Sequence, residues 1–182
     1  GNNGNGSGHV RVYNYDGSSW VQLGQDIDGA AHGDQSGSAV SISSDGSILA
    51  IGAQHGANNY GQVRVYSWDG STWNQFGQDI EGEGAGDRFG FSVSLSSAGN
   101  ILAAGADRND GNGSNSGHVR VYNWNGSTWT QLGNDIEGEG AGDASGWSVS
   151  ISSVGNKVAV GALANDGTGV DAGHVRVYNW NG

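Results

Sequence analysis

Three residue types are missing from this sequence: its 182 residues include no cysteine, no proline and no methionine. Without cysteine the chain can form neither a disulfide framework nor a metal or haem site that cysteine ligates. Its apolar runs are only a few residues long, whereas a membrane-spanning helix needs about 20, so we expect no membrane insertion. Basic residues are scarce, with 7 Lys and Arg against 18 Asp and Glu. This balance argues against nucleic-acid binding, which requires clusters of Lys and Arg.

Glycine and aromatic residues are abundant, with 36 Gly, 7 Trp and 6 Tyr. So much glycine can accompany disorder, but the regularly spaced aromatics and Val/Ile runs indicate a folded core. The sequence starts at Gly1 and shows no charged segment followed by an apolar one. We therefore expect that any targeting signal was removed or belongs outside this piece.

An internal repeat is the strongest signal in the sequence. The ten residues GHVRVYNWNG occur at 117–126 and again at 173–182. The glycine that opens this motif or a close variant recurs at Gly8, Gly61, Gly117 and Gly173, at intervals of 53, 56 and 56 residues. Such intervals are typical of solenoids, propellers and arrays. The sequence predicts one repeat array over 1–182, with repeats 8–60, 61–116 and 117–172, a partial repeat 173–182, and the end of a preceding inter-strand loop at 1–7.

Each repeat has the pattern of four short strands. In one copy these are FSVSLS (91–96), ILAAGA (101–106), HVRVYNW (118–124) and TWTQLG (128–133). Apolar residues alternate with a period of two, and Asn, Asp, Gly and Ser fill the connections. The sequence therefore predicts an all-β fold of four-stranded antiparallel meanders, each repeat about 55 residues long. We expect these sheets to be β-propeller blades, because a solenoid coil is usually shorter, about 20–30 residues.

The strands amount to just over three blades, about 3.25, which is too few to close a ring. We therefore interpret the chain as an excerpt of a longer array, or as one of several copies that complete a ring or fibre together.

Residues 86–106, GDRFGFSVSLSSAGNILAAGA, resemble an FG-GAP repeat, the blade unit of integrin-α-like propellers. Phe89-Gly90 match the FG and Gly105-Ala106 match the GA, whereas Asp107 stands where the motif has proline. The resemblance implies an extracellular or surface-exposed propeller that serves adhesion or recognition, not catalysis. Many blades of this family carry a calcium loop between their first two strands. Here that connection is a minimal turn with at most one carboxylate, Asp45, so we expect the family's calcium site to be missing.

Acidic residues gather on one predicted face. Turns alternate between the two faces of a meander, and all acids except Asp16, Asp45 and Asp69 fall on or beside the face with the long loops. One hypothesis is a divalent-cation site, such as one for Ca²⁺, in the loops NDGNG and NDGTG, since Asp and Asn oxygens are suitable ligands. The alternative is that these residues provide solubility and Asx turns, because their spacing is not that of an EF-hand. The candidate ligands are Asp107, Asn109, Asp110, Asn112, Asn165, Asp166 and Asp171.

One arginine recurs in the middle of the third strand of every copy, and it is flanked by valines. A guanidinium packed between blades requires an anionic partner. We therefore predict structural ion pairs, with two alternative sets of partners. The arginines are Arg11, Arg64, Arg120 and Arg176, and the partners are either the Asp of Gly-Asp (Asp34, Asp87, Asp143) or the Asp of Asp-Ile (Asp26, Asp79, Asp135).

The remaining polar and aromatic motifs suggest no catalysis. His9, His118 and His174 share one repeat position, where the second copy has Gln62, and we interpret them as polar residues at a strand edge. The aromatic pairs on either side of each Asp-Gly or Asn-Gly turn are interpreted as packing residues. Three sequons are candidate glycosylation sites: Asn5, Asn112 and Asn125.

The sequence favours a non-enzymatic module of an extracellular or cell-surface protein. It would act as an adhesive or structural scaffold, for example as part of a filament or sheath. Its main partners would be other copies of the same repeat or chain. One alternative is a carbohydrate-binding propeller with one shallow site per blade, using a loop aromatic such as Tyr60. Another is a recognition propeller that binds divalent cations, glycans or surface proteins.

Overall fold

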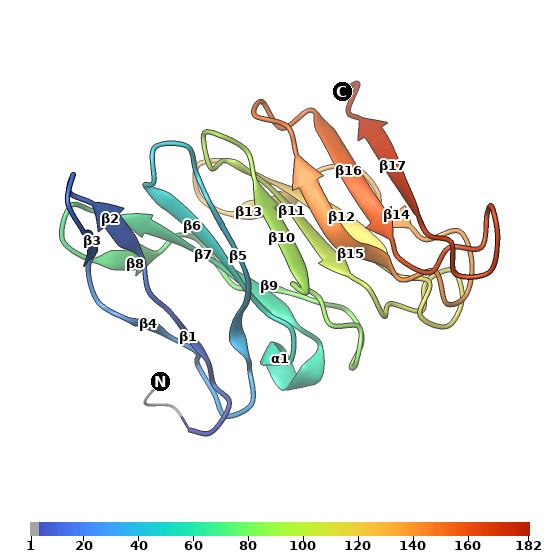
Figure 1. The fold of residues 1–182 in the computed structure, drawn as a ribbon, viewed down its shortest axis with the longest axis horizontal. Helices are drawn as coiled ribbons and strands as arrows, with labels where there is room; N and C mark the ends of the chain where they lie inside the picture. Colours follow the sequence, from blue (N-terminus) through green and yellow to red (C-terminus); the bar gives the residue numbers. More distant parts are fainter. Residues whose placement is uncertain (1–3) are drawn as a thin grey trace.

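The computed structural model describes residues 4–182; part of the predicted loop segment 1–7 therefore lies outside the described residues. Antiparallel sheets stand side by side in chain order, from the N-terminus at one end of the row to the C-terminus at the other (Figure 1). The predicted fold class is confirmed: the chain is all-β and consists of meander repeats of the β-propeller blade type.

Two blades are complete. The first complete blade contains β5 (Ser36–Ile42), β6 (Ile48–Ala53), β7 (Gln62–Trp68), β8 (Trp73–Gln75) and β9 (Ile80–Glu81). The second complete blade contains β10 (Ser92–Leu95), β11 (Ile101–Ala106), β12 (His118–Trp124), β13 (Trp129–Gln131) and β14 (Ile136–Glu137). In both, the predicted fourth strand is divided into two pieces that pair with the same third strand. A glycine with a positive φ lies between the two pieces, Gly77 in one blade and Gly133 in the other, and it turns the backbone away from the third strand.

The blades at the two ends of the row have fewer strands. The N-terminal half-blade supplies the third and fourth strands as β1 (His9–Val10), β2 (Tyr13–Tyr15), β3 (Trp20–Gln22) and β4 (Ile27–Asp28). The C-terminal blade supplies the first three as β15 (Ser145–Ile151), β16 (Lys157–Ala162) and β17 (His174–Asn179). The element α1 (Gly56–Asn59) is a turn with left-handed backbone at Ala57 and Asn58. No helix among residues 4–182 is long and apolar enough to cross a membrane.

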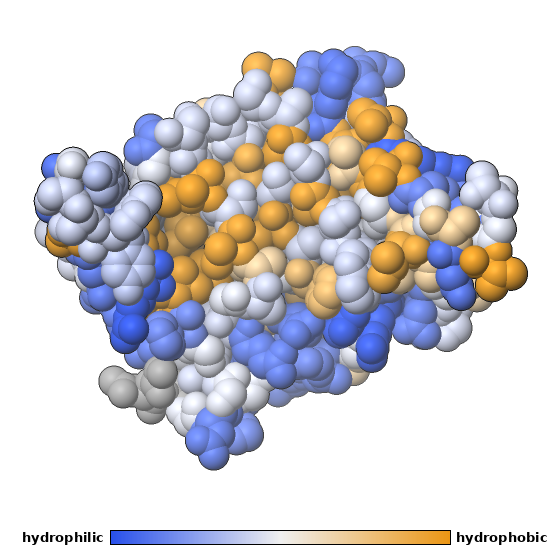
Figure 2. All heavy atoms as spheres, viewed as in Figure 1, coloured by the Kyte–Doolittle hydropathy of each residue, from blue (hydrophilic) through white to orange (hydrophobic). Residues whose placement is uncertain are grey.

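The hydrophobic core lies between the blades. The second strand of the second complete blade is buried along its whole length, because neighbouring sheets cover both of its faces. The effect of a neighbour is clear at one repeat position: Val63 and Val119 are 0% exposed, whereas Val175 in the C-terminal blade is 69% exposed. Figure 2 shows apolar side chains running across the middle of one face, with hydrophilic side chains along its margins.

The glycines of the two halves of the FG-GAP motif lie against each other across the blade boundary. A Cβ atom added to Gly52 would lie 2.0 Å from the carbonyl oxygen of Gly90, and one added to Gly105 would lie 2.2 Å from that of Gly146. These distances are far shorter than any side chain tolerates, so only glycine allows the two backbones to touch. The motif glycines therefore permit the close contact between blades.

Candidate functional site

The repeated arginines pair with the aspartates of the Asp-Ile dipeptides. Arg64 donates from Nε and Nη2 to the carboxylate of Asp79 at 3.0 and 2.7 Å, and Arg120 binds Asp135 in the same way. In the N-terminal half-blade Arg11 binds Asp26. Each aspartate immediately precedes the second piece of the fourth strand, which crosses beside the arginine. Hydrogen bonding from Arg64 holds the pKa of Asp79 below its usual value.

The alternative set of aspartates has a different role, and it does not pair with the arginines. Asp87 and Asp143 accept hydrogen bonds of 2.8 Å from the side-chain amides of Asn109 and Asn165. Asp34 accepts one of 2.8 Å from the backbone amide of Ala31. These carboxylates lie at the entry to the first strand, where they satisfy loop donors, and among residues 4–182 no ion pair joins them to the repeated arginines.

Two glutamates extend the ion pairs across the blade boundary. Glu83, in the connection that follows β9, contacts the guanidinium of Arg120 on β12 of the next blade. Glu139 makes the same contact with Arg176 on β17. The expectation that Arg176 pairs with one of the predicted aspartates is therefore wrong among the described residues. Sequence analysis did not identify these glutamates as partners of the arginines, although one signal was present. Ala30 occupies the repeat position of Glu83, and the copy that follows it has Gln62 where the copy that follows Glu83 has His118.

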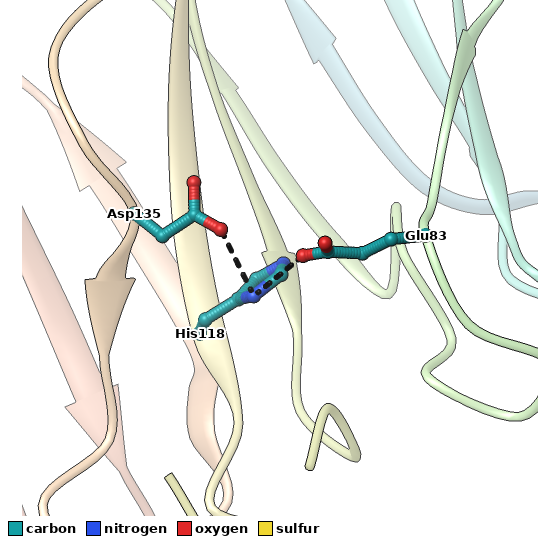
Figure 3. A group of neighbouring side chains, drawn as sticks. All are labelled: Glu83, His118 and Asp135. Atoms are coloured by element: carbon teal, nitrogen blue, oxygen red, sulfur yellow. Dashed lines mark ion pairs between the residues drawn. The ribbon is translucent and has the colours of Figure 1, made fainter. Parts of the chain in front are cut away.

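His118 lies buried beside this ion cluster (Figure 3). Its side chain is 1% exposed, and its Nδ1 lies 3.6 Å from a carboxylate oxygen of Glu83 and 3.7 Å from one of Asp135. Within the part of the chain that the structure describes, neither ring nitrogen has a hydrogen-bond partner. The interpretation of these histidines as edge residues is wrong for His118, because the neighbouring blade covers it; His9, at the end of the row, is exposed.

The three residues drawn in Figure 3 have the ligand types of a metal site, with ligand atoms within 4.8 Å of one another. The guanidinium of Arg120, however, contacts both carboxylates, and Gln131 donates to Asp135 as well. The guanidinium of Arg120 therefore supplies the positive charge that a metal ion would otherwise provide to Glu83 and Asp135. We interpret the cluster as an ion-pair network that fixes one blade against the next.

Acidification is expected to weaken the blade contact through His118. Burial and the charge of Arg120 lower the pKa of His118 to about 4 from 6.5, while Asp135 acts in the opposite direction. Between pH 6.5 and 4 the unfolded chain binds a proton that the folded chain does not, so stability falls over this interval by up to about 3 kcal/mol. His118→Gln, which copies Gln62, removes this dependence. The free energy of unfolding of both proteins is measured by urea denaturation at pH 7, 5.5 and 4.5. The same dependence on pH in the two proteins would contradict this role of His118.

Arg120→Met is expected to lower the free energy of unfolding by about 2–3 kcal/mol, because it leaves two carboxylates without their cation. The matched control is Arg11→Met. The Arg11 side chain is 45% exposed against 14% for Arg120, and Asp26 is its one ion-pair partner among residues 4–182, so the expected loss is below about 1 kcal/mol. Chemical denaturation compares the two. Equal losses in the free energy of unfolding for the two variants would show that Glu83, which contacts Arg120 across the blade boundary, contributes nothing to stability.

Several of the candidate calcium ligands in the long loops make hydrogen bonds or ion pairs within the chain. Asp107 pairs with Arg88, and Asp110 and Asp166 each accept a backbone amide from the residue five positions later at 2.8 Å. Asn109 and Asn165 accept amides two residues on, as in Asx turns, while Asn112 donates to a backbone carbonyl. Within residues 4–182, the described group of three ligand atoms involves none of the candidates named from the sequence, Asp171 included. Glycosylation stays a prediction; Asn5 and Asn125 are exposed.

Two of the fourth-strand tryptophans, Trp73 and Trp129, are buried between neighbouring blades. Trp129 donates its indole N–H to the backbone carbonyl of Phe76 in the preceding blade at 3.0 Å. The side-chain amide of Gln78 bonds to both backbone groups of Trp129, at 2.8 and 3.1 Å. Trp73 repeats the arrangement one blade earlier. The rings also contact the aromatic across their hairpin, 5.4 Å between centroids for Trp68 and Trp73, so the packing interpretation is confirmed.

These blades and their repeated contacts define a repeat protein of the β-propeller type. The family model of the FG-GAP repeat matches residues 81–122, which span parts of both complete blades. No curated protein matches the sequence. Among solved structures, the chain is similar to the crystal structure of a putative 6-phosphogluconolactonase from Bacteroides uniformis ATCC 8492, with a TM-score of 0.62 and 14% identity. The match covers 96% of this chain and 45% of the other, less than half its length, and at this identity it shows the fold alone.

Proposed function

We propose that the chain is a non-enzymatic, extracellular or cell-surface module that acts as an adhesive or structural scaffold by associating with other copies of itself. The observation that carries the proposal is that each blade buries its apolar face against a nearly identical neighbouring blade. Val175 and Val177 are 69% and 67% exposed on β17, at positions whose equivalents in the first complete blade are 0% exposed. A repeat that buries this face between blades is suited to bury it between chains.

The location outside the cell is supported by the family and the composition. FG-GAP repeats are typical of extracellular propellers, and the chain matches that repeat at residues 81–122. A net charge of −11 suits a soluble, solvent-facing module. Sugar binding through Tyr60, which is 37% exposed, stays a prediction that a glycan array can test.

Self-association is tested by light scattering and negative-stain electron microscopy over a range of protein concentrations. We expect multi-chain particles, extended or ring-shaped, that grow with concentration. The double variant Val175→Lys/Val177→Lys should stay monomeric at every concentration, because it places two positive charges on the exposed face of β17 that is proposed to associate. Val154→Lys is the matched control, since Val154 is 73% exposed in a turn away from that face. Single chains at every concentration would contradict the proposal.

A further inference from the structure

His118 is a buried polar side chain that the ion-pair network leaves unsatisfied. It is 1% exposed, and within the described residues neither ring nitrogen has a hydrogen-bond partner. Burial and the charge of Arg120 lower the pKa of His118 to about 4, so at pH 7 the ring is neutral and forms no ion pair. A neutral imidazole carries a lone pair on one nitrogen. Here Nδ1 faces the carboxylates of Glu83 and Asp135 (Figure 3), at distances longer than a hydrogen bond.

The spacing of these three groups is close to that of ligands around one metal ion. Nδ1 of His118 lies 3.6 Å from an oxygen of Glu83 and 3.7 Å from one of Asp135. Bonds from Zn²⁺ to nitrogen and oxygen are about 2.0–2.2 Å, which places neighbouring ligand atoms of a tetrahedral site about 3.4 Å apart. The Glu83 side chain is 48% exposed and can move to close the remaining gap. An imidazole ligand favours a transition metal, whereas Ca²⁺ takes six to eight oxygens.

The repeat links the glutamate to the histidine rather than to the arginine. The copy with Gln62 at the histidine position has Ala30 at the glutamate position, so both ligand types are replaced together. Its arginine, Arg64, is retained, pairs with Asp79 and has a side chain only 19% exposed. Such an arginine is therefore accommodated without a second acid. A shared metal ion explains why the glutamate and the histidine occur together.

The charges around His118 also favour a divalent cation. Glu83, Asp135 and Glu137 formally carry three negative charges, and Arg120 carries one positive charge, which leaves an excess of two negative charges. Burial raises the pKa of Glu137, and the charges of Asp135 and Glu83 raise it further. One divalent ion would balance this excess.

We propose that Glu83, His118 and Asp135 together bind one divalent transition-metal ion such as Zn²⁺. Arg120 competes with this ion, because its Nη2 contacts both carboxylates. Its Nε donates to the other oxygen of Asp135 at 2.9 Å, so the guanidinium can keep that bond while Nη2 withdraws. Glu83 belongs to the connection after β9, and His118 and Asp135 belong to the next blade. The ion would therefore join two blades directly, a role that does not depend on the proposed self-association.

The test measures binding of Zn²⁺ alone to the whole chain by isothermal titration calorimetry, after removal of metal with a chelator. We expect one saturable site that excess Ca²⁺ does not block. His118→Gln, which copies Gln62, should weaken binding at least about tenfold, since even residues that only orient metal ligands contribute about 10- to 100-fold. The matched control is His174→Gln. His174 lies 3.7 Å from Glu139, but within residues 4–182 no third ligand joins that pair, so binding should change little.

Arg120→Met is the variant that distinguishes a metal site from a purely structural cluster. It removes the competing positive charge, so the folded variant should bind Zn²⁺ about tenfold more tightly or better, although it is less stable without metal. Circular dichroism first establishes that each variant is folded. If Arg120→Met does not fold, Glu83→Gln takes its place, because its exposed side chain tolerates the change, and it should bind at least about tenfold more weakly.

Three results overturn the inference. The first is equal affinity of the unmodified chain and His118→Gln, which would assign the binding to surface carboxylates alone. The second is no binding of Zn²⁺ by either the unmodified chain or folded Arg120→Met. The third is unchanged affinity in Glu83→Gln. Weaker binding by folded Arg120→Met would contradict the competition between the guanidinium and the ion.

Discussion

Trp129→Ala is expected to lower the free energy of unfolding by about 3–5 kcal/mol, the usual cost of removing a large buried aromatic side chain. Trp129 is 4% exposed and packs among residues of two blades, and its indole N–H has a partner in the preceding blade. The substitution leaves a cavity and an unsatisfied carbonyl at the boundary between them. Urea denaturation followed by circular dichroism measures the loss.

Trp20→Ala is the matched control, because the same repeat position lies at the end of the row. Trp20 is 69% exposed and contacts Tyr15 across its hairpin. We expect a loss below about 1 kcal/mol, since little area is removed from a buried environment. Similar losses for Trp20 and Trp129 would mean that the contact between blades contributes little to stability.

Gly105→Ala is expected to destabilise the chain by at least about 3 kcal/mol, above the common range for an overpacked core. The new methyl group would lie 2.2 Å from the carbonyl oxygen of Gly146, a backbone atom that moves only if the two blades separate. The readout is the thermal unfolding midpoint, together with binding of a hydrophobic dye that reports opened blade contacts.

Gly161→Ala provides the comparison for Gly105→Ala. Gly161 is the same motif glycine in the C-terminal blade, and its added methyl group would meet the hydroxyl of Ser148, 2.4 Å away, rather than a neighbouring backbone. A serine side chain can rotate away, so the expected loss is about 1 kcal/mol. A large loss at both glycines would indicate that the residue is needed within each strand and not between blades.

Much of the fold could be predicted from local patterns. Alternating residues such as those of β12 define a strand because successive side chains point to opposite faces of a sheet. Asp-Gly and Asn-Gly mark the hairpin between the third and fourth strands because they tolerate the turn's backbone. These rules act over a few residues, so the repeat, its strands and the FG-GAP resemblance all followed from the order of residues.

The candidate site was only partly predictable. Arginines flanked by valines in every copy indicated buried ion pairs, and the structure pairs three of them with the Asp of Asp-Ile. The bond from Glu83 to Arg120 joins residues 37 positions apart in different blades, and no pattern within one strand specifies it. The loop aspartates were considered for calcium because the sequence does not show which of their oxygens already accept backbone amides.

The sequence by itself determined the all-β repeat, the order of its strands and the residues that recur at each position, because short-range geometry and repetition specify them. Only the tertiary structure decided what each recurring residue does. Identical positions have different surroundings according to the blade beside them: His118 is buried and His9 exposed, and Val119 is covered and Val175 open. The reason is physical: burial depends on the neighbouring sheet, which lies a whole repeat away along the chain.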